Sequence, residues 1–401
     1  MTEIKVPYAS WYGDSEVTLT FPNEWNVIEA IPEDAAPLSE GLVELAFRNP
    51  IGSRRISELA ESKENAVLIV DDLTRPTPAS RLLPYILKEL KAGGIDEDDT
   101  KVVMATAAHR PQDREDLEKK LGEEALSKLE VFNHNPYDNL EYLGVSRRGT
   151  PIYINKYVCE SELKIGVGGI YPHGGAGYGG GGKIILPGVS GIETMEANHK
   201  NIRGAGHGII ENNENRADIE EVAGRAGLDV IVNVVINSKR EIAGVFVGDF
   251  IKAHREGVKL ARKVYRTNVP KDMDVVVVNA YPLDTELFQA VKALWAARES
   301  AKDDATIILF AACSEGRGYH ALYQKGGRLW VPPDNAWLKR ELKHRRLWIV
   351  SPNVSVKDVY QNYPQETMLF RSWNDAIEEL QTIYKKKINV AVFPCAPIQI
   401  S

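Results

Sequence analysis

Residues 163–187 read LKIGVGGIYPHGGAGYGGGGKIILP and place an apolar run typical of a buried strand directly before a glycine loop. Counted from Gly177, the loop reads G-x-x-x-x-G-K, which is the phosphate-binding loop of nucleotide triphosphatases up to its last position. Ile184 stands where that loop requires a Ser or Thr hydroxyl for magnesium. The sequence therefore argues against a magnesium-dependent hydrolase, although such glycines still let a backbone approach an anion closely. A flexible linker is the weaker alternative, because KIILP follows the glycines at once.

Two earlier apolar runs also end in polar residues. AVLIV at 66–70 is followed by DDLTRPTP, and KVVMATA at 101–107 is followed by a histidine. Buried apolar strands separated by helices indicate a parallel sheet, and ligands of such sheets bind beyond the carboxyl ends of the strands. The residues expected to gather at that edge are Asp72, Arg75, His109, His173 and Lys183.

The remaining pattern predicts a second α/β domain after the boundary segment RTNVPKDMD at 266–274. A strand is expected at 274–280, and Thr285 is expected to cap a helix that carries Phe288, Gln289 and Lys292. The other elements expected are a hairpin in the first thirty residues, strands at 229–237, 242–250, 306–312 and 346–351, and helices at about 80–92, 254–264 and 374–386. The fold class predicted is α/β, with two Rossmann-like domains at 1–267 and 268–401 and an active-site cleft between them.

Composition favours a small ligand over a macromolecular one. The 401 residues carry a formal net charge of −7, which makes nucleic acid an unexpected partner. MTEIKVPYAS lacks a signal pattern, and no apolar run approaches the roughly 20 residues of a membrane span, so we expect a cytoplasmic protein without membrane contact. The three cysteines lie far apart, so any metal site must rely on histidine.

Three of the eight histidines, His109, His173 and His199, lie near glycine-rich sequence. A single such histidine is more often structural, but three together with Lys183 indicate acid–base chemistry or metal binding. Arg75 precedes a rigid PTP segment that would hold its guanidinium ready for a carboxylate, with Asp72 to orient it. The alternatives are a surface cation for Arg75 and a phosphate clamp for Lys183. For Gln289 and Lys292 the alternative is a solvated helix face. The remaining histidines discussed, His207, His254, His320 and His344, are expected to be structural.

An ordered set of segments resembles the nickel-dependent lactate racemase family. These segments are DDLTRPTP, AAHRP, YPHGGAGYGGGGKIILPG, the pair Asn198-His199 sixteen positions after Lys183, and YPLD followed by QAVK. They run in order from Asp71 to beyond CSEG at 313–316, which is most of the chain. The resemblance implies a racemase or epimerase that inverts the hydroxyl-bearing carbon of a 2-hydroxy acid, lactate or a relative, by reversible hydride transfer.

The resemblance also implies a cofactor, the nickel-pincer nucleotide, which is a Ni(II) pyridinium-3-thioamide-5-thiocarboxylate mononucleotide. It implies that domain 1–267 binds this cofactor, that domain 268–401 closes over the substrate, and that cofactor-synthesis proteins are transient partners. By resemblance, Lys183 is joined covalently to the cofactor through a thioamide, and His199 is the nickel ligand. The acid–base histidines fall on His109 and His173, the substrate positions on Arg75, Gln289 and Lys292, and the other cofactor positions on Asp72, Gly179, Gly180, Gly181, Gly182 and Trp337.

One position departs from the lactate enzymes of the family. They carry a tyrosine before the glutamine, and this chain carries Phe288, which removes a hydroxyl from the expected substrate wall. A larger or more apolar 2-hydroxy acid is therefore a hypothesis. Two other classes stay open from the residues alone, namely a non-catalytic nucleotide- or phosphate-binding protein and a histidine-based zinc hydrolase.

Overall fold

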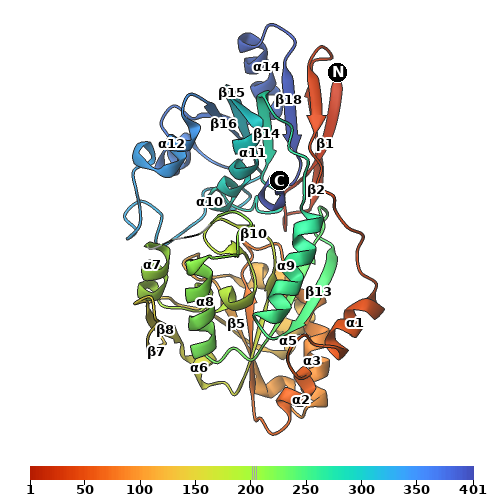
Figure 1. Ribbon diagram of the computed structural model, residues 1–401, viewed down its shortest axis with the longest axis vertical. Helices are drawn as coiled ribbons and strands as arrows, with labels where there is room; N and C mark the ends of the chain where they lie inside the picture. The colour runs from red at the N-terminus through yellow and green to blue at the C-terminus, as the bar shows by residue number, and fades with distance from the viewer. Residues whose placement is uncertain (201, 203, 205) are drawn as a thin grey trace. The chain divides into compact units, whose positions relative to one another are not determined.

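The chain forms two α/β units, and one of them is assembled from both ends of the sequence (Figure 1). The structure is a computed structural model that describes residues 1–401 with the exception of 201, 203 and 205. The central unit is residues 35–264, and the terminal unit combines residues 1–34 with residues 265–401. The prediction of an α/β fold with two Rossmann-like parts is confirmed.

The central unit is built on a six-stranded sheet in the order β13-β12-β9-β4-β5-β6. Neighbouring strands run parallel except for the antiparallel pair β12 and β13. The strands are β4 (Ala66–Asp71), β5 (Thr100–Ala105), β6 (Glu130–Asn133), β9 (Leu163–Gly169), β12 (Val230–Ile236) and β13 (Ile242–Gly248). Two small antiparallel pairs complete it, β7 (Leu140–Val145) with β8 (Pro151–Asn155) and β10 (Pro172–His173) with β11 (Gly177–Tyr178).

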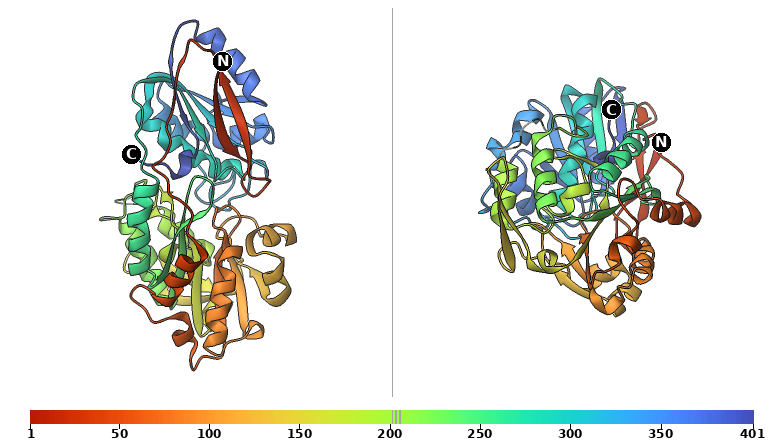
Figure 2. Two further views of the ribbon diagram at one scale, coloured as in Figure 1. Left: turned by 90° about the vertical axis from the view of Figure 1, so that its right-hand side faces the viewer. Right: turned by 60° about the horizontal axis from the view of Figure 1, so that its bottom comes forward.

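Helices cover both faces of this sheet (Figure 2). Apolar residues of α2 and α3 pack on one face with Leu68 and Val70 of β4, whereas α9 packs near Gly244 and Phe246 of β13 on the other. The helices are α1 (Glu40–Arg48), α2 (Ile56–Ala60), α3 (Leu83–Ala92), α4 (Arg114–Leu121), α5 (Glu123–Lys128), α6 (Lys156–Glu160), α7 (Ile192–Lys200), α8 (Glu214–Arg225) and α9 (Lys252–Val264). Single 3-10 turns are η1 (Ala79–Arg81), η2 (Glu97–Asp99) and η3 (Gly181–Ile184).

The local sequence explains why β4 and α3 form where they do. Every residue of β4 is buried, as expected for a central parallel strand covered on both faces, and this accounts for its continuous apolar run. Pro84 lies in the first turn of α3, where its missing N–H costs nothing. Gly93 ends the helix, and a Cβ atom there would lie 2.3 Å from the Ser57 carbonyl oxygen. The predicted helix and its glycine stop are confirmed.

The terminal unit has its own six-stranded, wholly parallel sheet in the order β17-β16-β15-β14-β18-β3. Its strands are β3 (Asn26–Glu29), β14 (Met273–Asn279), β15 (Ala301–Phe310), β16 (Arg346–Val350), β17 (Met368–Phe370) and β18 (Asn389–Phe393), and β1 (Thr2–Tyr8) and β2 (Ser15–Phe21) form a hairpin. Its helices are α10 (Leu287–Ala290), α11 (Leu294–Ser300), α12 (Trp337–Leu342), α13 (Val356–Asn362) and α14 (Trp373–Ile383), with 3-10 turns η4 (Val291–Ala293), η5 (Pro333–Asn335) and η6 (Ala396–Ile398).

The predicted first domain, 1–267, needs correction at its beginning. Residues 1–34 belong to the terminal unit, because β3 pairs in parallel with β18 and the hairpin packs Val6, Leu19 and Phe21 against the strands of that unit. Neither β3 nor β18 was predicted as a strand, so this pairing was not predicted. The later boundary, between residues 264 and 265, lies three residues from the predicted one.

The predicted strands and the other predicted helices are present, with ends that differ by up to five residues. The predicted cap at Thr285 is wrong: α10 begins at Leu287 after Glu286, no side chain caps it, and the helical stretch is divided into α10, η4 and α11. The carbonyl oxygen of Thr285 instead accepts a hydrogen bond from the backbone of Glu315. A search of the described residues finds no helix with the length and apolar character needed to cross a bilayer.

Candidate active site

The end of β4 carries a carboxylate–histidine pair. Asp72 is 1% exposed, and its Oδ2 lies 2.5 Å from Nδ1 of His109. Its Oδ1 accepts a hydrogen bond from the hydroxyl of Thr74 at 2.5 Å and another from the Thr74 amide at 3.1 Å. Burial favours a raised pKa for Asp72, but His109, Arg75 and Thr74 outweigh it and hold the pKa well below its usual range. The carboxylate therefore accepts the Nδ1–H of His109 and fixes the orientation of its ring.

Arg75 belongs to the same network through Thr74. Its Nη1 donates to the Thr74 hydroxyl at 2.9 Å, and its amide donates to the carbonyl oxygen of Asp72 at 3.0 Å. The predicted orientation of Arg75 by Asp72 is therefore made through the Thr74 hydroxyl and the backbone.

A buried lysine that sequence analysis missed holds this loop from beneath. Lys120 of α4 is completely buried, pairs with Asp71 at 2.7 Å and donates to the carbonyl oxygen of Arg75 at 3.0 Å. Asp71 also accepts a hydrogen bond from Thr77 at 2.6 Å. The available signal was helical spacing, since Lys120 lies on the same side of α4 as Leu117 and Leu121.

The glycine loop brings Lys183 to His173. Lys183 lies in η3, and its Nζ is 3.2 Å from Nε2 of His173. The Nδ1 atom of His173 accepts hydrogen bonds from the amides of Gly175 at 3.1 Å and Ala176 at 3.2 Å, so the ring proton is on Nε2. Burial, then the charges of Arg75 and Arg216, lower the pKa of Lys183 well below its ordinary value. The Nε2–H of His173 is thus directed at Nζ of Lys183, and burial favours the uncharged form of that amine.

His109 and His173 are held through the same ring nitrogen in different ways. Nδ1 of His109 faces the carboxylate of Asp72, whereas Nδ1 of His173 accepts from two backbone amides.

His199, near the end of α7, is held by a backbone hydrogen bond. Its Nδ1 donates to the carbonyl oxygen of Met195 at 2.8 Å, which places the ring proton on Nδ1 and the lone pair on Nε2. Burial, followed by the charge of Lys183, lowers the pKa of His199 to about 4. Its neighbour Asn198 donates to the buried carboxylate of Asp218 at 2.8 Å and so anchors the helix. A neutral imidazole fixed by a backbone acceptor is the form that binds a transition metal.

The glycines 179–182 make close backbone contacts within the protein. Gly180 and Gly181 have φ of 73° and 60°, and a Cβ atom on Gly180 would lie 2.6 Å from Oδ1 of Asn233. The amide of Gly179 donates to Tyr171 and that of Gly181 to Asn233, each at 2.7 Å. These two amides are therefore engaged by the chain itself and do not form the anion cradle that the loop sequence suggested.

The terminal unit carries the remaining predicted residues. Gln289 is 3% exposed and lies between Glu286, at 3.3 Å, and Lys292, whose Nζ is 2.5 Å from Oε1 of Gln289. The alternative of a solvated helix face is therefore wrong for Gln289. Phe288 has Arg317 over its ring at 5.9 Å and the ring of His320 at 6.0 Å between centroids.

Trp337 is less enclosed than these residues. It is the first residue of α12 and is 44% exposed.

Comparison with known proteins shows which family this chain resembles. Residues 12–208 match the lactate racemase N-terminal domain, and residues 267–328 match the lactate racemase C-terminal domain. The lactate racemase of Thermoanaerobacterium thermosaccharolyticum is 33% identical over 338 residues, which are 81% of this chain and 78% of that protein. The chain belongs to the lactate racemase family. The lactate racemase of Lactiplantibacillus plantarum is 34% identical over 290 residues, 70% of this chain and 68% of that protein.

Solved structures agree with the family assignment. The lactate racemase apoprotein from Thermoanaerobacterium thermosaccharolyticum superposes with a TM-score of 0.79 at 29% identity, covering 100% of this chain and 99% of that one. A Thermotoga maritima protein matches with a TM-score of 0.67 at 16% identity over 90% of this chain and 97% of that one, which shows a shared fold alone. Family membership favours a racemase over the two open alternatives, a simple phosphate-binding protein and a zinc hydrolase.

The two matched lactate racemase domains contain most of the predicted site and leave out some of it. Residues 12–208 include Asp72, His109, His173, Lys183 and His199, and residues 267–328 include Phe288, Gln289 and Lys292. Trp337 lies beyond both matched regions, as do Arg216 and His254, two buried residues that contact the glycine loop.

Proposed function

We propose that this member of the lactate racemase family inverts the hydroxyl-bearing carbon of a 2-hydroxy acid, lactate or a relative of it. The observation that carries the proposal is the 3.2 Å contact between Nζ of Lys183, an amine whose pKa burial lowers, and Nε2 of His173, together with the hydrogen-bonded pair of Asp72 and His109. The two relatives named lactate racemase support the reaction class.

The proposed cofactor is the nickel-pincer nucleotide, and the donor set fits it. A neutral amine is the nucleophilic form that a lasting covalent bond to Lys183 requires, and His199 offers a neutral Nε2 to nickel. When bound, this group supplies a hydride acceptor close to the substrate carbon. Asp72 and the glycines 179–182 are also proposed to contact the cofactor. The glycines are included because they let the backbone approach neighbouring groups closely. Trp337 is assigned there on resemblance alone.

The chain's own residues then handle the proton and the carboxylate. A carbon-bound hydrogen of a 2-hydroxy acid is too weakly acidic for a histidine to remove as a proton, so the histidines act on the hydroxyl group. His109 accepts the hydroxyl proton at Nε2 while Asp72 stabilises the imidazolium that forms. Arg75, Gln289 and Lys292 are proposed to bind the carboxylate and an oxygen of the substrate, and exclusion of water keeps the planar 2-keto acid in place.

The same role at His173 requires a change of state. While its Nδ1 accepts the amides of Gly175 and Ala176, its Nε2 carries the proton and cannot accept another. If the two histidines act on opposite faces of the keto acid, His173 must break its hydrogen bonds with the amides of Gly175 and Ala176 or rotate its ring. Single-turnover formation of keto acid from each pure enantiomer tests the division: His109→Asn blocks one enantiomer and His173→Asn blocks the other. Equal loss for both enantiomers in both variants contradicts it.

The test of the whole proposal is peptide mass spectrometry of protein produced with nickel and the cofactor-synthesis proteins. A mononucleotide-sized addition on the peptide containing Lys183, with racemisation of a 2-hydroxy acid, is the expected result. An unmodified Lys183 in protein exposed to the finished cofactor refutes it. A cytoplasmic location and transient contact with the synthesis proteins belong to the same proposal.

Phe288 is proposed to set the preference among 2-hydroxy acids. Phe288 directly precedes Gln289, has Arg317 and His320 beside its ring, and offers an apolar ring edge where a tyrosine would present a hydroxyl. We expect larger acids such as phenyllactate to be turned over at least as well as lactate, and Phe288→Tyr to shift the ratio toward lactate by about tenfold. Chiral chromatography of lactate, phenyllactate and malate reactions measures this. A strict preference for lactate in the unaltered protein defeats the hypothesis.

A further inference from the structure

The carbonyl groups of the glycine loop are bound by side chains from elements distant in the sequence. Each backbone carbonyl oxygen from Gly175 to Gly180 accepts a hydrogen bond, and only that of Gly177 relies on the backbone alone, the amide of Gly208. The other five accept from side chains of the segment that starts α8 or from α9. A loop this rich in glycine has high conformational freedom when unfolded, so its single course must be imposed from outside.

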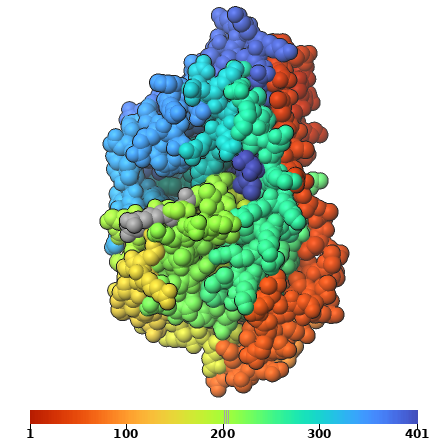
Figure 3. Space-filling view, viewed as in Figure 1, coloured from red at the N-terminus to blue at the C-terminus, as the bar shows by residue number. Residues whose placement is uncertain are grey.

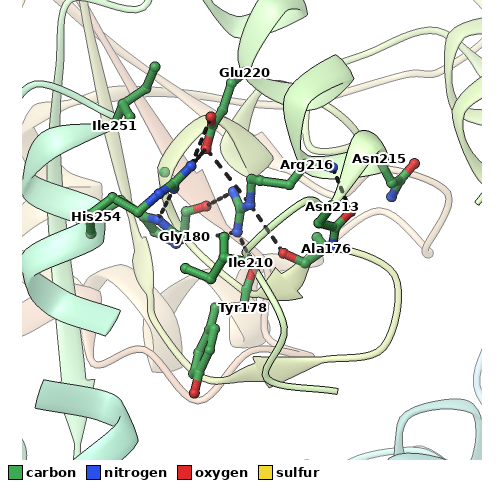
Figure 4. A network of polar contacts seen from close by, with 12 residues as sticks. Ala176, Tyr178, Gly180, Ile210, Asn213, Asn215, Arg216, Glu220, Ile251 and His254 are labelled. Atoms are coloured by element: carbon green, nitrogen blue, oxygen red, sulfur yellow. Dashed lines mark hydrogen bonds and ion pairs between the residues drawn. The ribbon is translucent and has the colours of Figure 1, made fainter. Parts of the chain in front are cut away.

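Arg216 makes the largest share of these contacts (Figure 4). It is 1% exposed, and its guanidinium donates to Ala176 at 3.1 Å, to Gly180 at 3.1 Å and to Tyr178. A planar fork of five N–H donors can span three carbonyls of one loop, which a lysine ammonium on a flexible stem does less well.

His254 binds the carbonyl oxygen of Gly179, which is not among the three that Arg216 binds. Its Nε2 donates to Gly179 at 2.8 Å, and its Nδ1 accepts from Arg255 at 2.9 Å, which fixes the tautomer. Arg255 is held in turn by Glu220 of α8 at 2.7 Å. The outer faces of α8 and α9 reach the surface (Figure 3), whereas the side chains of Arg216 and His254 are buried beneath it.

Asn213 and Asn215 extend the same support to the start of the loop. Both side-chain amides donate to the carbonyl oxygen of Gly175 at 3.2 Å. With its carbonyl directed to them, the peptide following Gly175 points its N–H, that of Ala176, to Nδ1 of His173 at 3.2 Å. The contacts that fix the loop thereby also fix the tautomer of His173.

We infer that Arg216 and His254 are positioning residues that impose the course of residues 174–183 and so set His173 and Lys183 side by side for cofactor attachment. The inference rests on the proposed function for what Lys183 receives, but the loop geometry itself does not depend on it. Neither residue touches Lys183 through a hydrogen bond that the structure records. Their positioning action is through the backbone and is separate from the effect of the Arg216 charge on the pKa of Lys183, and it explains why a buried cation is kept under a glycine loop.

The experiment compares Arg216→Lys, which keeps the charge and removes the fork, with Arg225→Lys, the same change at an exposed position of the same helix. A second pair is His254→Leu, which leaves the Gly179 carbonyl without its donor, and His254→Gln, which restores an N–H donor. Hydrogen exchange of the peptide spanning 174–187 is measured in protein that has never met the cofactor. The fraction of Lys183 carrying the adduct is then measured by peptide mass after exposure to finished cofactor.

We expect Arg216→Lys and His254→Leu to speed exchange of the 174–187 amides about tenfold or more and to lower adduct formation, while Arg225→Lys and His254→Gln resemble the unaltered protein. Unchanged exchange in a folded Arg216→Lys or His254→Leu variant overturns the inference. Faster exchange with full adduct formation also overturns it, because the loop course would then not matter for attachment. If the unaltered protein forms no adduct while the exchange difference remains, the proposed function fails and the positioning of the loop stands.

Discussion

The loop after β4 and the glycine loop meet the same need, a fixed set of reactive side chains, in different ways. The loop after β4 is held largely by its own side chains: Thr74 donates to Asp72, Thr77 donates to Asp71, and Arg75 donates to Thr74. The glycine loop has almost no side chains of its own, and its carbonyls are bound by α8 and α9. The first loop is specified mainly by its own side chains, with Lys120 and His109 as distant partners, whereas the second is specified by the tertiary structure.

This difference separates what substitutions should do in the two loops. In the loop after β4, a changed residue removes its own contact and its own chemistry. In the glycine loop, the reactive residue and the residues that hold it lie more than thirty positions apart, so chemistry and support can be altered independently.

The largest expected effect tests the chemistry of the glycine loop. Lys183→Arg removes the neutral amine while keeping a long basic side chain, so we expect no adduct on the peptide and a loss of racemisation of about a thousandfold or more. Peptide mass and chiral chromatography measure both. Lys164→Arg, at another partly buried lysine whose Nζ donates to Ser161, is the matched control and should keep the adduct. A Lys183→Arg protein that still racemises would remove the lysine from the reaction.

The next effect tests the loop after β4. Asp72→Asn deprives His109 of the carboxylate that fixes its tautomer and stabilises its cation, so kcat should fall about 10²- to 10⁴-fold with a smaller change in KM. Thr74→Val, which removes one donor to the same carboxylate, should cost only about tenfold. Steady-state kinetics on cofactor-loaded protein measure both, normalised to adduct content. An effect of Thr74→Val as large as that of Asp72→Asn would mean that the loop collapses as a whole.

The buried support of that loop should appear in stability. Lys120→Met leaves Asp71 buried without its cation and should lower the free energy of unfolding by about 3–5 kcal/mol. Lys120→Met combined with Asp71→Leu should recover part of that loss. Denaturant unfolding followed by circular dichroism measures both. A single variant as stable as the parent would show that the pair does not support the loop.

A smaller effect concerns the segment that follows Lys183. His134 is 3% exposed, donates from Nε2 to Ser190 at 2.8 Å and accepts from Asn155 at 3.2 Å. Burial lowers its pKa from 6.5 to about 4, so the unfolded chain binds a proton that the folded protein does not. Its contribution to stability is complete above pH 6.5 and falls as pH drops toward 4, by up to about 3 kcal/mol. Unfolding free energies of His134→Gln and parent, measured from pH 7.5 to 4.5, should converge at low pH; parallel curves would exclude His134 as the titrating group.

Sequence patterns were sufficient for much of the site. Apolar runs ending in DDLTRP, in a histidine and in a glycine loop predicted strands β4, β5 and β9, which are present, and the hydrogen-bonded pair of Asp72 and His109 follows the ends of β4 and β5. The reason is physical: a central parallel strand is buried on both faces, so its apolar run and its polar end can be recognised without knowledge of its neighbours.

Other features were beyond such patterns. Strand β3 is an edge strand of the terminal sheet, and three of its four residues are exposed. Its sequence therefore did not indicate that it pairs with a strand more than 350 positions away. Lys120, Arg216 and His254 resembled surface or structural residues, because only their packing shows that each binds a loop distant in the sequence.

The sequence by itself determined which polar residues follow successive strands, that a lysine follows the glycines, and which family these segments resemble. These features could be recognised because buried strands and glycine loops have local sequence patterns. The tertiary structure alone decided which residues hold those groups. A carbonyl has no side chain to reveal its partner, so the arginine and the histidine that bind the glycine loop are known only once α8 and α9 are placed against it.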